Sequence, residues 1–269
     1  MKSYKVGVTM RIYYFSGTGN SLAISRKLSE LLVGDCKIVS ISVFENTETI
    51  DVEEEAIGFV FPVYFETLPD VVKLFVKKLN FKTHPYIFGV ATCNGVPGHS
   101  LFSLSKYLNI KGESLSSGFV IDMPGNALIT PQEVEVQRLK ESKLKIAEIA
   151  QYINSRSTKE IEGDNGFRRH VESFVVGNIA KKLQFASKRY YSTSDCIHCS
   201  ICKKVCPVNN IEIVDKKPKW GNNCAACLAC FHWCPKKAIV INGMISKRHQ
   251  YHHPEISVKD IELKNSSLF

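Results

Sequence analysis

The stretch CIHCSICKKVCP, residues 196–207, is matched in pattern by CAACLACFHWCP, residues 224–235. Each stretch spaces four cysteines as C-x2-C-x2-C-x3-C and places a proline, Pro207 or Pro235, directly after the last one. Eight of the ten cysteines of the chain lie in these two stretches. Because proline fixes φ and lacks a backbone donor, we expect the chain to turn away after each fourth cysteine.

This spacing is the bacterial signature of [4Fe-4S] clusters, in which the fourth cysteine of each run ligates the other cluster. The predicted ligands are Cys196, Cys199, Cys202 and Cys234 for one cluster, and Cys206, Cys224, Cys227 and Cys230 for the other. Zinc is an alternative, but zinc ligands usually come in pairs separated by a long spacer. Disulfides are a second alternative, but they need an oxidising compartment, and the start of the chain lacks the apolar segment of a secretory signal.

Residues 190–246 resemble a clostridial-type two-cluster ferredoxin. The resemblance implies a small pseudo-twofold fold of short strands and turns that carries single electrons at low potential. Strands are expected at residues 211–214 and 238–241, and His198 is expected at the surface. Six apolar side chains are expected to pack against the clusters: Ile197, Ile201, Val205, Leu228, Phe231 and Trp233.

The length and charge of the chain indicate two domains and a basic second half. At 269 residues the chain exceeds one average domain. Its net charge of +9 is concentrated in residues 166–269, which hold 17 Lys+Arg against 7 Asp+Glu. Thiolate-bound clusters would compensate part of this excess. Four lysines lie beside the predicted ligands, where they could stabilise thiolates or dock an acidic redox partner: Lys203, Lys204, Lys236 and Lys237. Solvated surface is the alternative for each of them, and a nucleic-acid partner is the weaker interpretation.

In the first half, a strand at residues 10–15 runs into Ser16-Gly17-Thr18-Gly19-Asn20-Ser21, and a helical pattern follows at once. Such a loop at a helix N-terminus presents amides, hydroxyls and the positive end of the helix dipole, which together favour a phosphate. The loop lacks the G-x-G-x-x-G fingerprint of dinucleotide-binding folds and the Gly-Lys-Ser/Thr of a P-loop. A simple helix cap is the alternative.

Two later loops also follow strands. A strand at residues 56–61 runs into Pro62-Val63-Tyr64-Phe65, and one at residues 86–91 runs into Thr92-Cys93-Asn94-Gly95. Further strands are expected at residues 37–42 and 114–122, and helices at residues 101–108 and 132–154. Since open parallel sheets bind ligands at the carboxyl ends of their strands, the three loops are expected to share one crevice.

Residues 10–154 resemble flavodoxins. The resemblance implies an α/β fold with a five-stranded parallel sheet of order 2-1-3-4-5, and FMN as cofactor. It implies phosphate contacts from Ser16, Thr18 and Ser21 with Asn20 alongside, a flanking aromatic from Tyr64 or Phe65, and backbone groups of residues 92–95 at the ring edge. The predicted FMN-binding residues are Ser16, Gly17, Thr18, Gly19, Asn20, Ser21, Pro62, Val63, Tyr64, Phe65, Thr92, Cys93, Asn94 and Gly95. Residues 123–126 are expected to close over this site.

Several of these residues have plainer interpretations. Tyr64 is as readily a packing residue, Cys93 a small loop residue and Cys36 a buried one. His99 is either a helix-start residue or a proton donor to flavin or substrate. Residues 155–189 are expected to be a linker and docking helix, with a hinge at residues 155–166. Residues 247–269 are expected to be a basic, solvated tail whose histidines lack metal-ligand spacing.

Together the two halves resemble flavodoxin-ferredoxin fusion proteins of anaerobic microbes. The resemblance implies an electron-transfer protein that relays electrons between two [4Fe-4S] clusters and FMN. The alternative is an FMN-dependent reductase of a small acceptor, such as a quinone or nitro compound, with His99 and Tyr64 as candidate acids. A zinc-binding or nucleic-acid-binding module is the third hypothesis. The expected partners are redox proteins, not nucleic acid or membrane, in a monomer or homodimer. A cytoplasmic setting is expected, because no apolar run is long enough to cross a membrane.

Overall fold

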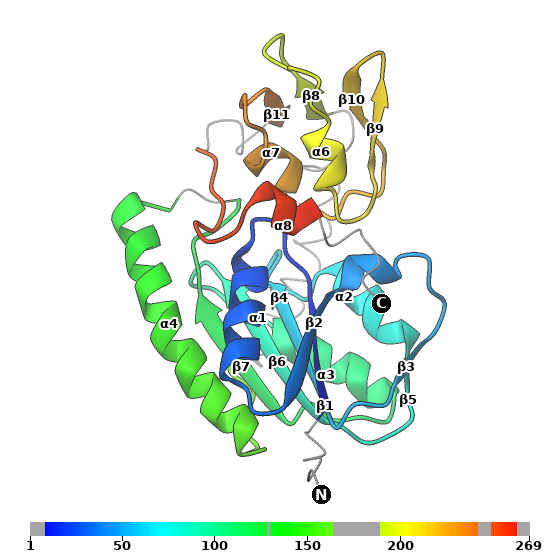
Figure 1. The fold of residues 1–269 in the computed structure, drawn as a ribbon, viewed down its shortest axis with the longest axis vertical. Helices are drawn as coiled ribbons and strands as arrows, with labels where there is room; N and C mark the ends of the chain where they lie inside the picture. The colour runs from blue at the N-terminus through cyan, green and yellow to red at the C-terminus, as the bar shows by residue number, and fades with distance from the viewer. Residues whose placement is uncertain (1–8, 128–129, 164–188, 242–248, 263–269) are drawn as a thin grey trace, which may run out of the picture.

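The computed structural model describes residues 9–127, 130–163, 189–241 and 249–262 (Figure 1). An α/β half comprises the chain up to residue 163, and the cysteine-rich half sits over the carboxyl ends of its strands (Figure 1). The predicted docking helix, apart from Arg189, lies outside the described residues. No helix in the described ranges is long and apolar enough to cross a membrane.

The sheet of the first half has five parallel strands. They are β1 (Thr9–Tyr14), β2 (Asp35–Ser40), β4 (Ala56–Pro62), β6 (Tyr86–Cys93) and β7 (Ser117–Asp122). Their order is β2-β1-β4-β6-β7, which confirms the predicted 2-1-3-4-5 arrangement. Residues 56–61 are buried without alternation, as expected for a parallel strand that is covered on both faces.

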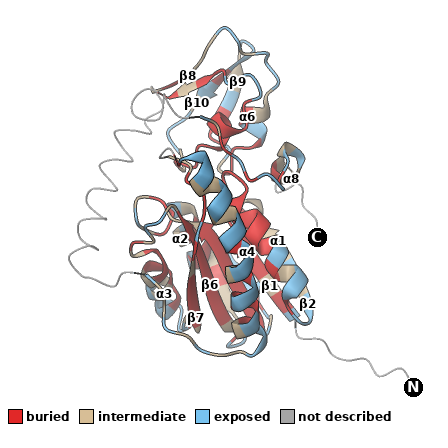
Figure 2. Cartoon of the chain, turned by 90° about the vertical axis from the view of Figure 1, so that its left-hand side faces the viewer, coloured by how far each residue is buried: buried red, intermediate tan, exposed pale blue. Residues whose placement is uncertain are grey.

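Four helices form the layers on either side of this sheet. They are α1 (Asn20–Leu31), α2 (Asp70–Lys78), α3 (Ser100–Ile110) and α4 (Gln132–Asn154). Helix α1 packs against α4, and α2 packs against α3, so that each pair covers one face. Figure 2 shows the buried strands between these layers and the exposed outer face of α4.

Short elements complete the first half. The strand expected at residues 37–42 ends earlier, because a 3-10 turn, η1 (Ile41–Phe44), begins where the Ser40 hydroxyl accepts a hydrogen bond from the Ser42 amide. Strands β3 (Ile50–Val52) and β5 (Leu79–Phe81) form a separate parallel pair.

The cysteine-rich half repeats one pattern twice. Its elements are β8 (Tyr190–Ser192), α6 (Ile201–Lys204), β9 (Ile211–Val214), β10 (Lys217–Trp220), α7 (Ala229–His232) and β11 (Ile239–Ile241). Strand β9 pairs antiparallel with β10, and β8 with β11. Ser200 and Leu228, at equivalent positions of the two cysteine runs, both adopt positive φ, at 61° and 59°. The repeated cysteine pattern therefore gives a repeated backbone conformation.

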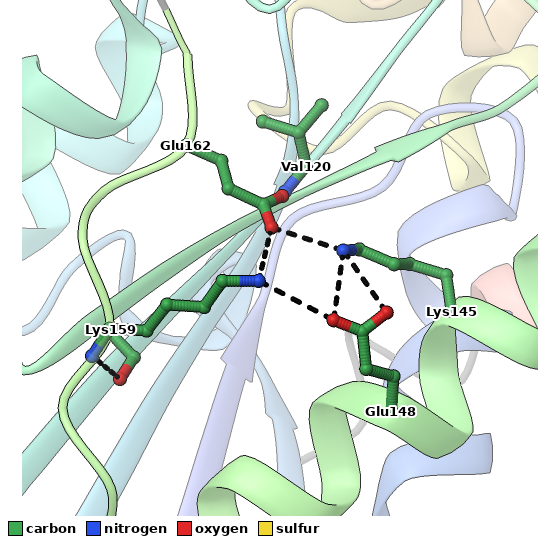
Figure 3. A network of polar contacts seen from close by, with 6 residues as sticks. Val120, Lys145, Glu148, Lys159 and Glu162 are labelled. Atoms are coloured by element: carbon green, nitrogen blue, oxygen red, sulfur yellow. Dashed lines mark hydrogen bonds and ion pairs between the residues drawn. The ribbon is translucent and has the colours of Figure 1, made fainter.

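The segment at residues 155–163 is not a free hinge. It lies along the outer edge of β7, where the Lys159 and Glu162 amides donate to the Ser116 and Gly118 carbonyls at 3.2 and 3.0 Å. Glu162 also accepts from the Val120 amide at 2.7 Å and pairs with Lys145 and Lys159 at 3.1 and 2.7 Å (Figure 3). Residues 155–163 therefore cover the sheet edge, and residues 164–166 of the expected hinge or linker lie outside the described residues.

The described part of the C-terminal segment, residues 249–262, packs back onto the protein. It includes α8 (Val258–Glu262), and its buried side chains are Tyr251, His253, Ile256 and Ile261. Arg26 on α1 pairs with Asp260 at 2.6 Å. The expected solvated tail is thus wrong for these residues. We call residues 249–262 the strap.

Candidate functional site: a crevice beside two cysteine sites

A crevice of about 400 Å³ opens at the carboxyl edge of the sheet. It is lined by Ser16, Gly17, Thr18, Asn20, Ser21, Pro62, Val63, Tyr64, Phe65, Glu66, Thr92, Cys93, Asn94, Val96, Met123, Pro124, Gly125, Asn126, Ala127 and Ala226. All three predicted loops thus meet in one place. Gly19 and Gly95 are the predicted residues that do not line it.

Residues 123–126, expected from their position alone, form another wall of the crevice. Ala226 was missed by sequence reasoning, since it belongs to the other half and nothing local marks it.

The first loop has the features of a phosphate site. Gly19 adopts φ 96°, and its amide donates to the Ser16 hydroxyl at 3.1 Å, at the N-terminus of the twelve-residue helix α1. The Ser21 and Thr92 hydroxyls lie 3.3 Å apart. The N-terminus of α1 and the hydroxyl-bearing residues Ser16, Thr18 and Ser21 therefore lie at the crevice, which favours an anionic group there.

Asn20 lines the crevice beside Ser21, and its side chain also makes two hydrogen bonds to other segments. Its amide nitrogen donates to the Pro124 carbonyl at 3.0 Å, and its Oδ1 accepts from the Tyr251 hydroxyl at 2.7 Å. The side chain thus ties the first loop to the crevice wall and to the strap.

Tyr64 is buried with its ring edge-on to Phe15, at a centroid distance of 6.1 Å. Burial raises the pKa of Tyr64, so its phenol is neutral. Phe65 follows with a left-handed φ of 52° and contacts the cores of both halves. Tyr64 is therefore largely a packing residue, and either ring can border a planar ligand in the crevice.

Asn94 is oriented by a residue that sequence reasoning missed. Arg138 of α4 donates to the Asn94 Oδ1 and to the Met123 carbonyl. Because a guanidinium only donates, it turns the Asn94 amide nitrogen toward Gly125, a crevice residue. Arg138 therefore fixes the orientation of a side chain that lines the crevice.

Cys93 and His99, which were candidates for redox or acid chemistry, make contacts that favour a structural role. The Cys93 thiol donates to the Asp122 carboxylate at 3.1 Å, and burial together with this contact raises its pKa. His99 does not line the crevice and stacks on Phe102 at 5.3 Å. Cys93 is thus a protonated crevice residue, and His99 has the helix-start position that was the alternative.

The eight cysteines gather into two sets of four. One cavity is lined by Cys196, Cys199, Cys202 and Cys234, which we call the distal cysteine site. A second cavity is lined by Cys206, Cys224, Cys227 and Cys230, which we call the proximal cysteine site. In each site three cysteines come from one run and the fourth from the other. No group of three or more His, Cys, Asp or Glu in the described ranges is arranged to hold a single metal ion.

The surroundings of the thiols fit a sulfur-rich cluster. Backbone amides of Asn210 and Ala238 donate to Cys206 and Cys234, each at 3.3 Å. The indole N–H of Trp220, which lines the proximal site, is buried without a nitrogen or oxygen partner in the described residues, so sulfur is the acceptor open to it. Burial raises the pKa of Cys202 to about 11, so that a bound cation would favour its thiolate form.

The proximal site lies against the crevice. The Trp233 indole donates to the Gly17 carbonyl at 2.9 Å, and the Asn126 amide donates to the Cys227 carbonyl at 3.3 Å. A Cβ on Gly17 would lie only 2.6 Å from the Cys227 carbonyl oxygen. One crevice loop and one cysteine of the proximal site are thus in direct contact.

Four of the six apolar residues lie where they were expected: Ile197 and Ile201 line the distal site, Leu228 lines the proximal site, and Phe231 packs with the cysteines. Ile197 is also 54 % exposed. Val205 and Trp233 belong instead to the core cluster of the first half, which also includes Cys227. The cause is the docking of the two halves, which places one face of the repeat on the crevice.

The strap forms hydrogen bonds with both halves of the protein. The Gln250 side chain donates to the Phe231 and Cys234 carbonyls at 2.6 and 2.8 Å, and the Tyr251 amide donates to His232 Nδ1 at 3.0 Å. The His253 amide donates to the Thr18 carbonyl at 2.9 Å. One segment therefore holds both the cysteine-rich half and the first crevice loop.

Fold and cysteine pattern define the class of protein: a flavodoxin-like α/β half, with the sheet order of that fold, is joined to a ferredoxin-type iron-sulfur half. Residues 189–212 match the family model described as 4Fe-4S binding domain, which implies at least one such cluster and electron-transfer chemistry.

Solved structures similar to the first half are redox proteins by their titles. A flavodoxin from the domain Archaea is 17% identical over 53% of this chain and 99% of its own, with a TM-score of 0.35. An azoreductase from Bacillus anthracis is 13% identical over 55% of this chain and 99% of its own, with a TM-score of 0.37. Rubredoxin:oxygen oxidoreductase from Desulfovibrio gigas is 15% identical over 53% of this chain and 36% of its own, with a TM-score of 0.29. No curated protein matches the chain.

Proposed function

We propose that this chain relays electrons between two [4Fe-4S] clusters and one FMN. The crevice would hold FMN, with its phosphate at residues 16–21 and its ring between the loops at residues 62–65 and 92–95. The distal and proximal cysteine sites would each hold one cluster. A flavin exchanges one or two electrons and each cluster exchanges one, so the cofactors supply a conversion between pair and single-electron chemistry.

One observation carries the proposal: the proximal site and the crevice share a wall. Ala226, between the ligands Cys224 and Cys227, lines the crevice, and Gly17 abuts the Cys227 backbone. A protein that only stored the two kinds of cofactor would not require contact between the proximal site and the crevice. The order supported is therefore distal site, proximal site, crevice.

The residues of the chain have definite parts in this function. Trp233 and Asn126 fix the proximal site against the crevice through their hydrogen bonds to Gly17 and Cys227. Buried apolar side chains, among them Leu228 and Ile211, keep water from the proximal site, and solvent exposure is one control of cluster potential. Arg138 fixes the Asn94 amide at the crevice rim.

The reductase alternative makes use of the same crevice but has less support. Of its two candidate acids, His99 lies outside the crevice, and the phenol of Tyr64 is buried. Turnover of a quinone or nitro compound by the FMN-loaded protein, faster than free FMN achieves, would favour this alternative.

The relay is tested by rapid anaerobic reduction of the loaded protein, with cluster and flavin absorbance followed separately. Cys227→Ser, at the shared wall, is expected to slow reduction of the flavin at least tenfold relative to the clusters that remain. Cys36→Ser, remote from both sites, serves as the thiol control and should leave both phases unchanged. Equal flavin reduction rates in Cys227→Ser and wild-type protein would contradict the relay.

A further inference from the structure

We infer that electrons enter or leave this chain at the distal cysteine site, through a basic surface that docks an acidic redox protein. The surface consists of residues 197–199 with Lys216 and Lys236, and we call it the distal surface. The inference rests on the proposed relay and adds its outer partner.

The two cysteine sites differ in their access to the outside, although their backbones repeat. Cys199 is exposed, whereas its equivalent in the second run, Cys227, is only 7 % exposed. Ile197 is 54 % exposed, whereas the equivalent Ala225 packs against the core of the first half. Within the described residues, the distal site is thus the one that presents a cysteine ligand at the surface.

The distal site is also the one whose described lining contains charged lysines. Lys216 and Lys236 line the distal site and are exposed, and no Asp or Glu is among its described lining residues. The described lining of the proximal site contains no charged side chain other than its cysteines. Lys204 is paired with Glu262 at 3.6 Å, whereas neither Lys216 nor Lys236 has a carboxylate within ion-pair distance in the described ranges.

These features specify the chemistry of the partner. An apolar centre at Ile197 with a charged rim is the usual anatomy of a transient protein interface. Unpaired lysines steer an acidic surface toward this centre and accelerate its association. In each encounter the reduced partner gives up one electron and the distal site gains one, with no bond made or broken. Two encounters supply the pair that a flavin accepts.

The test measures the second-order rate of anaerobic electron transfer from a reduced, acidic two-cluster ferredoxin to the loaded protein at several ionic strengths. The double variant Lys216→Glu/Lys236→Glu is expected to lose at least tenfold in rate at low salt and most of its salt dependence, because steering contributes 10- to 1,000-fold. At high salt the rates of variant and wild type should converge. Lys216→Arg/Lys236→Arg should retain the wild-type rate.

Lys106→Glu is the matched control, since Lys106 is an exposed lysine on α3 in the other half. An unchanged rate in the double glutamate variant with full iron content would overturn the inference, and so would an equal loss in Lys106→Glu. If the ferredoxin reduces the clusters of the wild-type protein in a salt-dependent way but the flavin does not follow, the relay fails while the docking surface stands.

Discussion

Gly17 is a residue at which the two halves are in close contact. A Cβ at this position would lie 2.6 Å from the Cys227 carbonyl oxygen, 3.1 Å from the Cys227 Cβ and 3.2 Å from the Tyr64 hydroxyl. Two of these three neighbours belong to one proposed cluster ligand. The absence of a side chain at Gly17 therefore sets how near the proximal site lies to the crevice.

Gly17→Ala is expected to push the halves apart, because overpacking against backbone costs about 1 to 3 kcal/mol. We expect a lower denaturation midpoint and weaker FMN retention, measured by unfolding in urea and by flavin fluorescence. Gly112→Ala is the control: its φ is 82° but nothing lies within 4 Å of the new Cβ. It should cost about 1 to 2 kcal/mol through backbone strain alone. Unchanged FMN retention in Gly17→Ala would contradict the close approach.

Cys36 is a second residue with a testable environment. Burial and, second to it, the negative charge of Asp35 raise the pKa of Cys36 to about 11. Thiolate is the reactive form of cysteine, so about one molecule in a thousand is reactive at pH 8. Alkylation of the loaded protein by iodoacetamide should therefore be slow at pH 8 and rise about tenfold per pH unit toward pH 11. A plateau near pH 9, measured by mass spectrometry of the Cys36 peptide, would show an ordinary thiol.

At the scale of elements, the strap is the part whose role is least evident from its sequence. Tyr251 lies in a polar segment rich in histidine, yet it is buried. Its hydroxyl donates a hydrogen bond to Asn20, although 231 residues separate the two in the sequence. Removal of its hydroxyl leaves Asn20 Oδ1 without this donor, which costs about 1 to 3 kcal/mol for a buried acceptor.

Tyr251→Phe should thus weaken FMN binding about tenfold, since each 1.4 kcal/mol corresponds to a factor of ten. The dissociation constant is measured by titration of the flavin-free protein with FMN, monitored by fluorescence. Tyr191→Phe is the control, because Tyr191 is 46 % exposed and distant from the crevice. Equal dissociation constants for Tyr251→Phe and wild type would show that the strap does not contribute to FMN binding.

The edge of β7 is the second element with a specific stabilising contact. Burial opposes the change, but hydrogen bonds from Lys159, from the Val120 amide and from Lys145 lower the pKa of Glu162 (Figure 3). A lowered folded-state pKa means that this stabilisation is complete above the unfolded pKa of about 4.3 and disappears as the pH falls through the folded value.

Glu162→Gln should therefore lower the free energy of unfolding by about 1 to 2 kcal/mol at neutral pH. The difference from wild type should be constant from pH 7 to about pH 5.5 and shrink below about pH 4.3, as measured by urea denaturation at each pH. Glu141→Gln, on the exposed face of α4, should show little effect at any pH. A constant difference down to pH 3 would mean that the carboxylate charge is not the cause.

Much of the fold could be predicted because its signals are local. The strands that end in the loops at residues 16–21, 62–65 and 92–95 carry their own apolar patterns, and a parallel sheet brings their ends together. Spacing likewise predicted which four cysteines surround each cavity. The contacts of Trp233, Tyr251, Arg138 and Ala226 could not be predicted, because each joins segments far apart in the chain and leaves no periodic trace.

At the scale of the whole molecule, three proposed cofactor sites lie in sequence from the surface to the interior edge of the sheet. The distal site presents the exposed Cys199, and the proximal site contacts the crevice at Gly17 and Cys227. The α/β half could bind a flavin without its companion, and a ferredoxin half could carry electrons without the crevice. In the proposed relay, the shared wall at Gly17 and Cys227 connects the two halves.

The most direct measurement is the cofactor content of the protein purified without oxygen. The relay requires about eight irons and eight acid-labile sulfides, as two four-iron clusters demand, together with one FMN per chain. We expect these three values in the same preparation, with a brown colour and a flavin absorbance that is released on denaturation. Four irons or fewer per chain after reconstitution, or a crevice that takes up no FMN, would contradict the account.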